Sequence, residues 1–358
     1  MTAYSKYAKY LTTVVGSYSV PRWYESLEKE VEAGKLSRAD MADAQFRCTQ
    51  AAVKDQEVAG IDILTGGEMH RRTNNRHAPP NAMLNFFWEK LPGFAKETRP
   101  KPITKKDPDV FHPAAVCVSS IGYADLGLVE EFRTVSSQTD RDVKVTMTGP
   151  HMLAKVAFDE HYGDIGKMMQ DLAKVLNRNF RDLETAGCRY VQIDEPLFAV
   201  SDDAEVEAAV EAINLAVEGL KKTSVHVHVC QGNYAVGEEY DGQIGHRYFD
   251  YGRYPTDLIC RIRCDVLLVE HDFADRYEGR LGDKRLAVGA VDVQDPNVEA
   301  PEVIAERITR LRWLTPEQTL ITSSCGMNHL RREIAFGKLK AMAEAKRILL
   351  AKEAKSAA

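Results

Sequence analysis

The chain lacks long hydrophobic runs, and it lacks an excess of positive charge. A membrane-spanning helix needs about 18 or more consecutive apolar residues, and no run in this sequence reaches that length. Lysine and arginine together number 47 against 53 aspartates and glutamates, which gives a formal net charge of −6. A protein that binds the phosphate backbone of nucleic acid needs a basic face. These absences predict no membrane span and no nucleic-acid partner.

Cysteine is sparse and does not follow the pattern of a disulfide framework. The seven cysteines among 358 residues are odd in number and widely scattered, whereas disulfide scaffolds are short chains with evenly paired cysteines. The apolar run Leu11–Val15 is too short for the core of a secretion signal, and no small-residue cleavage site follows it. We therefore expect a cytoplasmic protein whose cysteines are buried, catalytic or bound to a metal.

The usual nucleotide-binding motifs are also missing. No Gly-x-Gly-x-x-Gly follows the first expected strand, and there is no Walker-type loop. What the chain does contain is an alternation of short β-branched runs with amphipathic segments of helical period. Strands are expected at residues 11–17, 61–65, 143–147, 188–193, 265–269, 286–291 and 320–323, with another in the segment 224–234. Helices are expected at residues 38–59, 126–135, 165–186, 206–220, 301–314 and 331–350.

This alternation predicts the architecture. Strands that alternate with helices imply a parallel sheet, and eight such units favour a closed (β/α)8 TIM barrel. We expect residues 1–358 to form one barrel domain. A polar, proline-rich excursion over residues 69–113 leaves the barrel between the second and third strands, and residues 114–123 are a candidate extra strand in it. An open, doubly wound sheet is the alternative.

The segment Ser224–Tyr234, which reads S-V-H-V-H-V-C-Q-G-N-Y, carries the most informative pattern. Its period of two places the valines on one face of a strand and His226, His228 and Cys230 on the other. A buried strand can carry histidine and cysteine for packing alone. The functional interpretation therefore depends on the residues at the other strand ends.

Polar residues stand at or just beyond the C-terminal ends of the expected strands. In an eight-stranded α/β barrel the active site is built at that face. Because the strands are assigned from apolar runs, this co-location is an independent observation. The residues are Ser17, Glu68, Asp194, His228, Cys230, Glu270 and Cys325.

Four of these side chains, His228, Cys230, Glu270 and Cys325, form a donor set suited to tetrahedral Zn²⁺. Ligands distributed over several strands favour a catalytic ion over a structural one. Zinc holds a thiol as thiolate near neutral pH, so that the sulfur can attack an alkyl group. Since four protein ligands fill a tetrahedral shell, we expect Glu270 to yield when the thiol binds. We expect His226 to be a wall residue and the remaining cysteines to serve packing.

A basic cluster follows Glu68 closely along the chain. It contains Arg71, Arg72 and Arg76. Two interpretations stay open at this point, a solvated loop and a clamp for an anionic group of the substrate.

Several short motifs, in their order and spacing, resemble the cobalamin-independent methionine synthase family, specifically its C-terminal catalytic barrel. The resemblance runs from Val14 to about Ile348, and the chain is similar to short members that lack the family's duplicated N-terminal barrel. The motifs are V-V-G-S at 14–17, G-G-E at 66–68, T-G-P at 148–150, Q-I-D-E-P at 192–196, H-V-C at 228–230, the glutamate at 270, D-P-N-V at 295–298 and C-G-M at 325–327.

The resemblance implies the same four zinc ligands and a methyl transfer to the thiol of homocysteine. It implies that the amino group of homocysteine meets Glu68 and Asp194, and that its carboxylate meets the backbone and hydroxyl of Ser17. Carboxylates that face an ammonium group form charge-assisted hydrogen bonds. The expected partners are therefore a small thiol and a methyl donor.

Two departures from the family pattern concern the methyl donor. Full-length members place a tryptophan shortly after T-G-P, whereas this chain has no tryptophan between Pro150 and Phe158. They also place a proton-donating histidine where this chain has Gln294, and a neutral amide cannot act as a general acid. The donor is thus left as either a methyl-folate or a methyl-corrinoid, the latter on a corrinoid protein.

Two further functions stay open. The epoxyalkane:coenzyme M transferases, a related branch, use a zinc-activated sulfonated thiol to open an epoxide, and the basic cluster could bind the sulfonate. The presence of Glu68 and Asp194 argues the other way, because coenzyme M has no amine to meet them. A protein that keeps the zinc site for binding, without transfer chemistry, is the third hypothesis.

Overall fold

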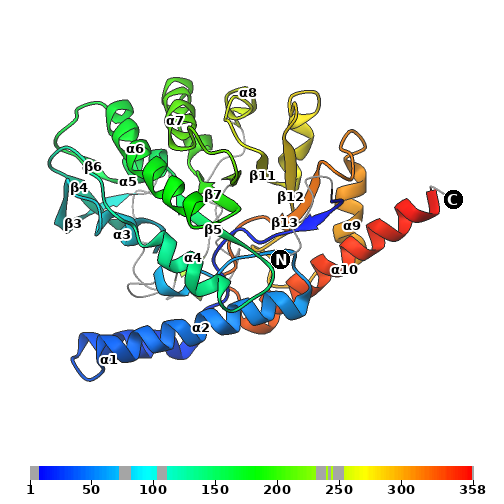
Figure 1. The fold of residues 1–358 in the computed structure, drawn as a ribbon, viewed down its shortest axis with the longest axis horizontal. Coiled ribbons are helices and arrows are strands. Elements are labelled where there is room, and N and C mark those ends of the chain that lie inside the picture. The colour runs from blue at the N-terminus through cyan, green and yellow to red at the C-terminus, as the bar shows by residue number, and fades with distance from the viewer. Residues whose placement is uncertain are drawn as a thin grey trace.

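The computed structural model describes residues 8–71, 82–102, 111–230, 239–240, 243–244 and 254–356, which build a parallel barrel surrounded by helices (Figure 1). Eight strands form one sheet in the order β1-β13-β12-β11-β8-β7-β5-β2. A parallel bridge between Thr13 and Ile63 joins the two ends of that order and closes the barrel. The strands are β1 (Leu11–Thr12), β2 (Ile63–Leu64), β5 (Asp142–Thr148), β7 (Tyr190–Asp194), β8 (Ser224–Val229), β11 (Val266–Glu270), β12 (Arg285–Val291) and β13 (Thr319–Ser323).

The barrel confirms the predicted fold class and rules out the open sheet. Each expected barrel strand is present at its expected place, although several are shorter than the apolar runs that indicated them. All described pairings in the barrel are parallel. Parallel strands need crossover connections, and helices supply them here.

The helices begin and end where local chemistry dictates. Helix α2 (Arg38–Ala59) begins and ends where it was predicted. Ser37 and Asp40 form a capping box at its start, and Gly60, whose φ is 96°, ends it. Helix α6 (Ile165–Thr185) begins at the Asp164 cap, and Gly187 follows it at φ 92°. The other predicted helices are α4 (Leu128–Ser136), α7 (Asp203–Ala216), α9 (Pro301–Arg310) and α10 (Arg332–Ser356).

Shorter elements escape the sequence pattern. A helix of one or two turns shows too few apolar repeats for its period to be recognised. Among the described residues, the missed helices of this kind are α3 (Ala82–Trp88), α5 (Pro150–Val156) and α8 (Thr256–Ile259). The longer helix α1 (Arg22–Glu32), of 11 residues, was missed as well. The 3-10 turns are η1 (Met69–Arg71), η2 (Phe198–Val200) and η3 (His271–Tyr277).

The excursion from the barrel is real, but it is not confined to the segment between the second and third strands. Strand β3 (Phe94–Pro102) pairs antiparallel with β4 (Phe111–Cys117), which confirms an extra strand close to the expected 114–123. Strand β6 (Phe158–Asp159), which pairs parallel with β4, follows the third barrel strand instead. This small sheet lies at one edge of the molecule in Figure 1. A separate hairpin joins β9 (Glu239–Tyr240) and β10 (Gln243–Ile244).

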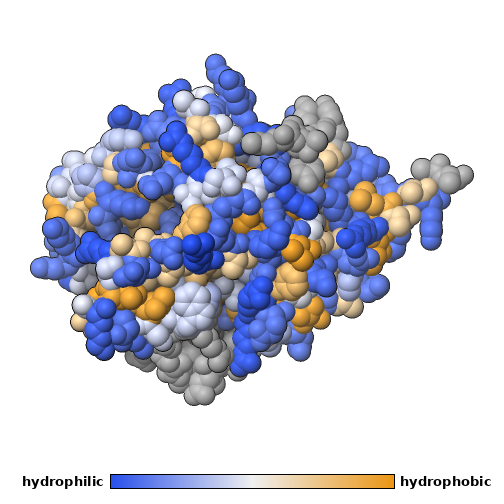
Figure 2. Space-filling view, turned by 60° about the horizontal axis from the view of Figure 1, so that its bottom comes forward, coloured by the Kyte–Doolittle hydropathy of each residue, from blue (hydrophilic) through white to orange (hydrophobic). Residues whose placement is uncertain are grey.

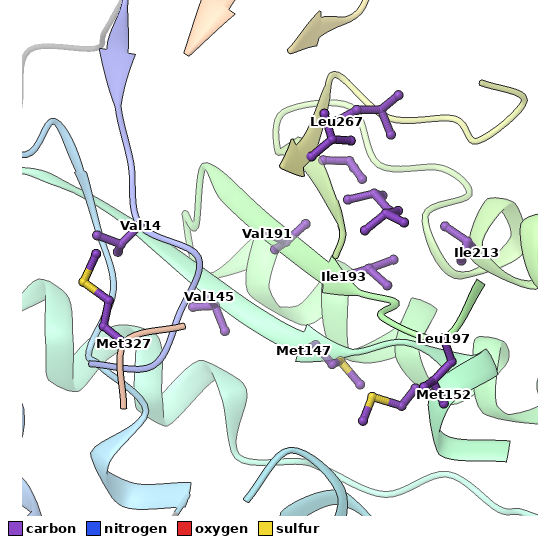
Figure 3. Packing of buried hydrophobic residues seen from close by; sticks show 14 of the residues in the cluster. Val14, Val145, Met147, Met152, Val191, Ile193, Leu197, Ile213, Leu267 and Met327 are labelled. Carbon is purple, nitrogen blue, oxygen red and sulfur yellow. The ribbon is translucent and has the colours of Figure 1, made fainter. Parts of the chain in front are cut away.

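The barrel strands separate two hydrophobic layers. The larger layer packs strand residues such as Val225 and Val227 of β8 against the surrounding helices, and Figure 3 shows part of it around β5 and β7. The smaller layer fills the barrel interior and contains Leu11, Val15, Ile63, Val266, Leu268, Ala287 and Leu320. The alternation predicted for the segment 224–234 is therefore confirmed through β8, with valines outside and histidines inside.

The barrel interior also contains polar side chains. His226 lies level with Val266 of the inner layer, and Gln192 lies level with His226 on the adjacent strand. Lys144, Gln192 and His226 are each at most 1% exposed. Lys144 and Gln192 are hydrogen-bonded to each other, and the ring of His226 packs edge-on against Tyr190 with ring centroids 5.7 Å apart. These residues therefore form their contacts within the barrel rather than with solvent.

On the outer surface, hydrophilic residues predominate on the face shown in Figure 2, and hydrophobic residues form small separate groups there. Among the described residues, no helix is both long and apolar enough to span a membrane.

Candidate active site

The predicted histidine and cysteine ligands meet at the C-terminal mouth of the barrel. His228 is near the end of β8, Cys230 follows that strand directly, and Cys325 follows β13. A ring nitrogen of His228 and the two Sγ atoms all lie within 4.8 Å of one another. The Sγ atoms of Cys230 and Cys325 are 3.4 Å apart. Two thiols and an imidazole, gathered from different strands, match the soft donors that zinc takes in proteins.

The electrostatics of the two thiols favour a bound cation. The contact with Cys325 and the burial of the sulfur hold the pKa of Cys230 well above its usual value. Two thiolates this close repel each other unless a positive charge compensates them. A divalent metal supplies that charge, so the donor set fits zinc on chemical grounds.

His228 is oriented by a residue to which the sequence assigned another role. Its Nδ1 lies 2.9 Å from Oδ1 of Asp194, and its Nε2 lies 3.3 Å from the carbonyl oxygen of Ser324. Burial alone would lower the pKa of His228, but Cys230 and Asp194 together raise it well above the usual value. A carboxylate on one ring nitrogen leaves the other nitrogen available to a metal, as in carboxylate–histidine–zinc triads. The sequence placed Asp194 at the mouth but gave no sign of this contact.

Glu270 ends β11 and is buried, with 8% of its surface exposed. Its carboxylate is not part of the compact group formed by the other three residues among those described. The prediction that Glu270 is the fourth ligand therefore stays a prediction. Glu270 and Cys230 both act on Tyr254, whose pKa is raised by burial and by these neighbouring negative charges. Tyr254 stacks on Phe273 with ring centroids 4.6 Å apart and is a site residue that the sequence did not reveal.

Glu68 is held in an unusual backbone conformation beyond β2. Its φ is 59°, in the left-handed region that residues with a side chain rarely adopt. Its Oε1 accepts a hydrogen bond from Thr146 Oγ1 at 2.5 Å and lies 3.6 Å from Nη1 of Arg71. A Cβ atom at Gly16 would overlap this carboxylate, so the glycine is needed for the close approach. Burial and the nearby Asp194 raise the pKa of Glu68, and Arg71 opposes that rise.

Ser17 lies in the loop that follows β1, at the mouth of the barrel. Its carbonyl oxygen accepts a hydrogen bond from Met327 N at 2.9 Å, and its hydroxyl donates to Asn328 Oδ1 at 3.3 Å. The loop after β1 is thereby joined to the loop that carries Cys325. Ser17, Glu68 and Asp194 thus stand at the same end of the barrel as the thiol pair, as predicted, although their contacts with a substrate stay a prediction.

The basic cluster is only partly described, and its first member is not a free cation. Arg71 is 2% exposed and donates from Nη2 to both carboxylate oxygens of Glu131, at 2.8 and 3.0 Å. The same Nη2 donates to the Thr146 carbonyl at 2.6 Å. These contacts favour a positioning role for Arg71 beside Glu68 over an anion clamp. Arg72 and Arg76 lie outside the described residues.

A second charged network lies beside the loop after β5, the region of the missing tryptophan. His151 is buried on α5, and its Nε2 lies 2.6 Å from Oε1 of Glu205 on α7. Lys155 donates to the same carboxylate oxygen at 2.6 Å. Glu195, next to Asp194 in the chain, accepts hydrogen bonds from the backbone N–H groups of His151 and Met152 at 2.9 and 3.0 Å. These contacts fix α5 against α7 and against the end of β7.

The fold and the site define a class, a TIM-barrel enzyme with a thiol-rich candidate metal site at its C-terminal mouth. Comparison with known proteins gives the family. The family model described as "Cobalamin-independent synthase, Catalytic domain" matches residues 10–347. The chain belongs to this family.

Relatives and solved structures agree with this assignment. The chain is 34% identical to a methionine synthase of Thermococcus kodakarensis over 351 residues, which cover 96% of each protein. It is 35% identical to a methionine synthase of Pyrococcus abyssi over 340 residues, which cover 94% of this chain and 92% of the relative. The structure of a B12-independent methionine synthase from Shewanella sp. W3-18-1 shares the fold, with a TM-score of 0.79, 24% identity and coverage of 98% and 100%.

Proposed function

We propose that this protein is a zinc-dependent S-methyltransferase that methylates the thiol of homocysteine to give methionine. The observation that carries the proposal is the close group of His228, Cys230 and Cys325 at the barrel mouth. The two relatives, which match almost the whole chain, are named methionine synthases, and this supports the same reaction.

Zinc, when bound, supplies the positive charge that keeps a coordinated thiol deprotonated near neutral pH. His228, Cys230 and Cys325 would hold the ion, and Glu270, at the end of β11, is the proposed fourth ligand. Because Glu270 stands apart from the other three, it is the residue we expect to give way to the sulfur of the substrate.

The chain also offers charge to the rest of the amino acid. Glu68 and Asp194 are negative groups at the mouth and would receive the ammonium group of homocysteine, while Ser17 would receive its carboxylate. An ammonium group between the buried Asp194 and the partly buried Glu68 relieves the repulsion of their carboxylates, which now contributes to the raised pKa of Glu68. Methyl transfer then needs the thiolate in line with the donor carbon.

The methyl donor is left as a methyl-folate or a methyl-corrinoid. Gln294 is 6% exposed and offers no acidic proton at the position where the family places a histidine. A methyl-corrinoid needs no such acid, because its leaving group is the reduced cobalt centre. A corrinoid protein is therefore one proposed partner.

Zinc X-ray absorption during thiol titration tests the proposal. Homocysteine is expected to add one sulfur to the zinc shell and coenzyme M is not, because Arg71, the described member of the basic cluster, is already paired with Glu131. A new sulfur from coenzyme M alone would favour epoxide opening, and no response to either thiol would favour a binding protein.

Two cysteine substitutions complete the test. Cys230→Ser and Cys325→Ser are each expected to lose zinc and methyl transfer together, since a hydroxyl is a poor ligand for zinc. Cys260→Ser is the matched control, because Cys260 is half-buried and lies outside the group at the mouth. A variant of Cys230 or Cys325 that lost zinc yet kept full activity would contradict the proposal.

A further inference from the structure

The barrel interior contains a chain of hydrogen bonds that begins beneath the site and ends on His228. Lys144 Nζ donates to Oε1 of Gln192 at 2.5 Å. Gln192 Nε2 donates to Oδ1 of Asp194 at 2.7 Å, and the same oxygen lies 2.9 Å from Nδ1 of His228. We call Lys144, Gln192 and Asp194 the interior relay. Lys144 and Gln192 are at most 1% exposed, so water does not compete for these bonds.

Each bond of the relay has only one possible direction. The carbonyl oxygen of Val15 can only accept, and it lies 2.6 Å from Nε2 of Gln192. Burial lowers the pKa of Lys144 to about 7. The charged and the neutral amine both donate, and Lys144 Nζ also donates to the carbonyl oxygen of Val14 at 2.7 Å. The amide of Gln192 therefore has its oxygen toward Lys144 and its N–H groups toward Val15 and Asp194. A flipped amide would place donor against donor on one side and acceptor against acceptor on the other.

These hydrogen bonds also determine which ring nitrogen of His228 carries the proton. Asp194 Oδ1 already accepts one hydrogen bond from Gln192. A carboxylate oxygen accepts only, so the facing Nδ1 of His228 carries its proton. When the ring is neutral, Nε2 no longer carries the proton that it donates to the carbonyl oxygen of Ser324 in the charged ring, and it bears the lone pair that a metal requires.

We propose that Lys144 and Gln192 are positioning residues that fix the Nδ1–H tautomer of His228 through Asp194 and so set the zinc affinity of the site. The inference rests on the proposed function for the identity of the metal, but the tautomer itself is a property of the protein. Neither Lys144 nor Gln192 is expected to touch the substrate, since both lie in the interior below the mouth.

Gln192→Glu and Lys144→Met test the relay. The first keeps the size of the side chain and the acceptor that faces Lys144, but removes the N–H donors to Val15 and Asp194. The second removes the donor that faces Oε1 of Gln192. Each is expected to weaken zinc binding about 10-fold, at the low end of the range seen when outer partners of metal ligands are replaced. The zinc dissociation constant is measured by competition with a chromophoric chelator.

Gln56→Glu is the matched control. Gln56 is also fully buried, and its Nε2 also donates to two backbone acceptors, the carbonyl oxygens of Ala52 and Thr65 at 3.0 and 2.9 Å. It sits on α2, outside the relay. Its substitution is expected to lower the unfolding temperature about as much as Gln192→Glu while leaving zinc affinity unchanged. Equal loss of zinc affinity in all three variants would overturn the proposal in favour of a general loss of stability.

A second readout needs neither zinc nor methyl transfer. The ¹⁵N chemical shifts of the His228 ring, identified by their loss in His228→Asn, report the tautomer in metal-free protein at a pH where the ring is neutral. The wild type is expected to show Nδ1–H, and both relay variants a mixture. An unchanged tautomer in the variants would overturn the relay, whatever the zinc affinity. If the wild type failed to bind zinc, the proposed function would fall, and the tautomer would still decide the relay. If one variant did not fold, the other would decide.

Discussion

Arg71 shows how burial changes what a charged residue means. In the sequence it belongs to a basic cluster and invites the hypothesis of an anion clamp. In the structure its guanidinium is enclosed by Glu131, Glu68 and the backbone of Thr146, and it lies 5.6 Å from the ring centres of both Phe86 and Phe87. Sequence pattern cannot distinguish the two cases, because the partner that neutralises Arg71 is 60 positions away along the chain.

This pairing predicts a strongly non-additive pair of substitutions. Arg71→Met leaves the buried Glu131 without its guanidinium and with only His70 beside it, and is expected to lower the free energy of unfolding by about 3 kcal/mol. Adding Glu131→Gln removes the stranded charge and is expected to restore much of that loss. Urea unfolding of the two single variants and the double variant measures the coupling. Losses that simply add would show that the ion pair is not the source.

A related expectation concerns the substrate. Because Arg71 also faces Glu68, Arg71→Met is expected to raise KM for homocysteine more than it lowers kcat, while Glu131→Gln alone changes KM less. This split distinguishes a positioning effect on Glu68 from a general loss of folded protein.

At the scale of elements, both boundaries of α2 were predictable from their chemical markers, whereas α5 was not predicted. Helix α2 begins at the capping box of Ser37 and Asp40 and ends at Gly60, and the sequence placed both ends correctly. Helix α5, of 7 residues, has no side-chain cap and begins at Pro150. Its position is set instead by Glu195, a contact made after β7 folds beside β5, and no local pattern reveals such a contact.

Gly149 makes that contact possible, and its replacement tests the connection. A Cβ at position 149 would overlap the Glu195 carboxylate. Gly149→Ala is therefore expected to displace Glu195 from the backbone N–H groups of His151 and Met152, with a loss of about 2 kcal/mol or more in unfolding free energy. Since Asp194 precedes Glu195 directly, kcat/KM is expected to fall as well.

Gly122→Ala is the control for that substitution. A Cβ at Gly122 meets only Pro92 carbons at 3.6 and 3.8 Å, which is ordinary contact. Its unfolding free energy and kcat/KM should stay near those of the wild type. If Gly149→Ala behaved in the same way, Glu195 would have an alternative place and would not position α5.

For the whole molecule, the order of strands and helices was sufficient to predict the barrel, and the strand ends were sufficient to predict that His228, Cys230 and Cys325 gather at its mouth. The rhythm of apolar runs is a local property, and parallel closure follows from it. Which interior side chains touch one another is not local. Lys144, Gln192 and His226 reach a shared interior from three strands, so their partners emerged only from the registered barrel.

The molecule is expected to lose stability in acid through two carboxylates in particular. Burial alone would raise the pKa of Glu131, but Arg71 and His70 lower it to about 2. Burial alone would also raise the pKa of Glu205, but His151 and Lys155 lower it to about 2. A carboxylate whose pKa is lower in the folded protein than the ordinary value of 4.5 stabilises the fold when it is ionised. For these two groups this stabilisation is fully present above about pH 4.5 and is lost as the pH falls toward 2.

Each shift corresponds to roughly 3 kcal/mol, as an order of magnitude. Urea unfolding between pH 7 and pH 3 should show the loss, and Glu131→Gln or Glu205→Gln should flatten the curve in that range. An unfolding free energy equally dependent on pH in the wild type and in both variants would assign the acid loss to other groups.

The relay inside the barrel has a consequence for any attempt to improve this protein. Burial lowers the pKa of Lys144 to about 7, so keeping this side chain in the interior opposes folding near neutral pH, and Lys144→Met is expected to survive a screen for heat resistance. The same change is expected to weaken zinc binding. Directed evolution that selects on melting temperature alone would therefore favour variants that are more stable but less active. The interior positions beneath the mouth should be held constant in such libraries.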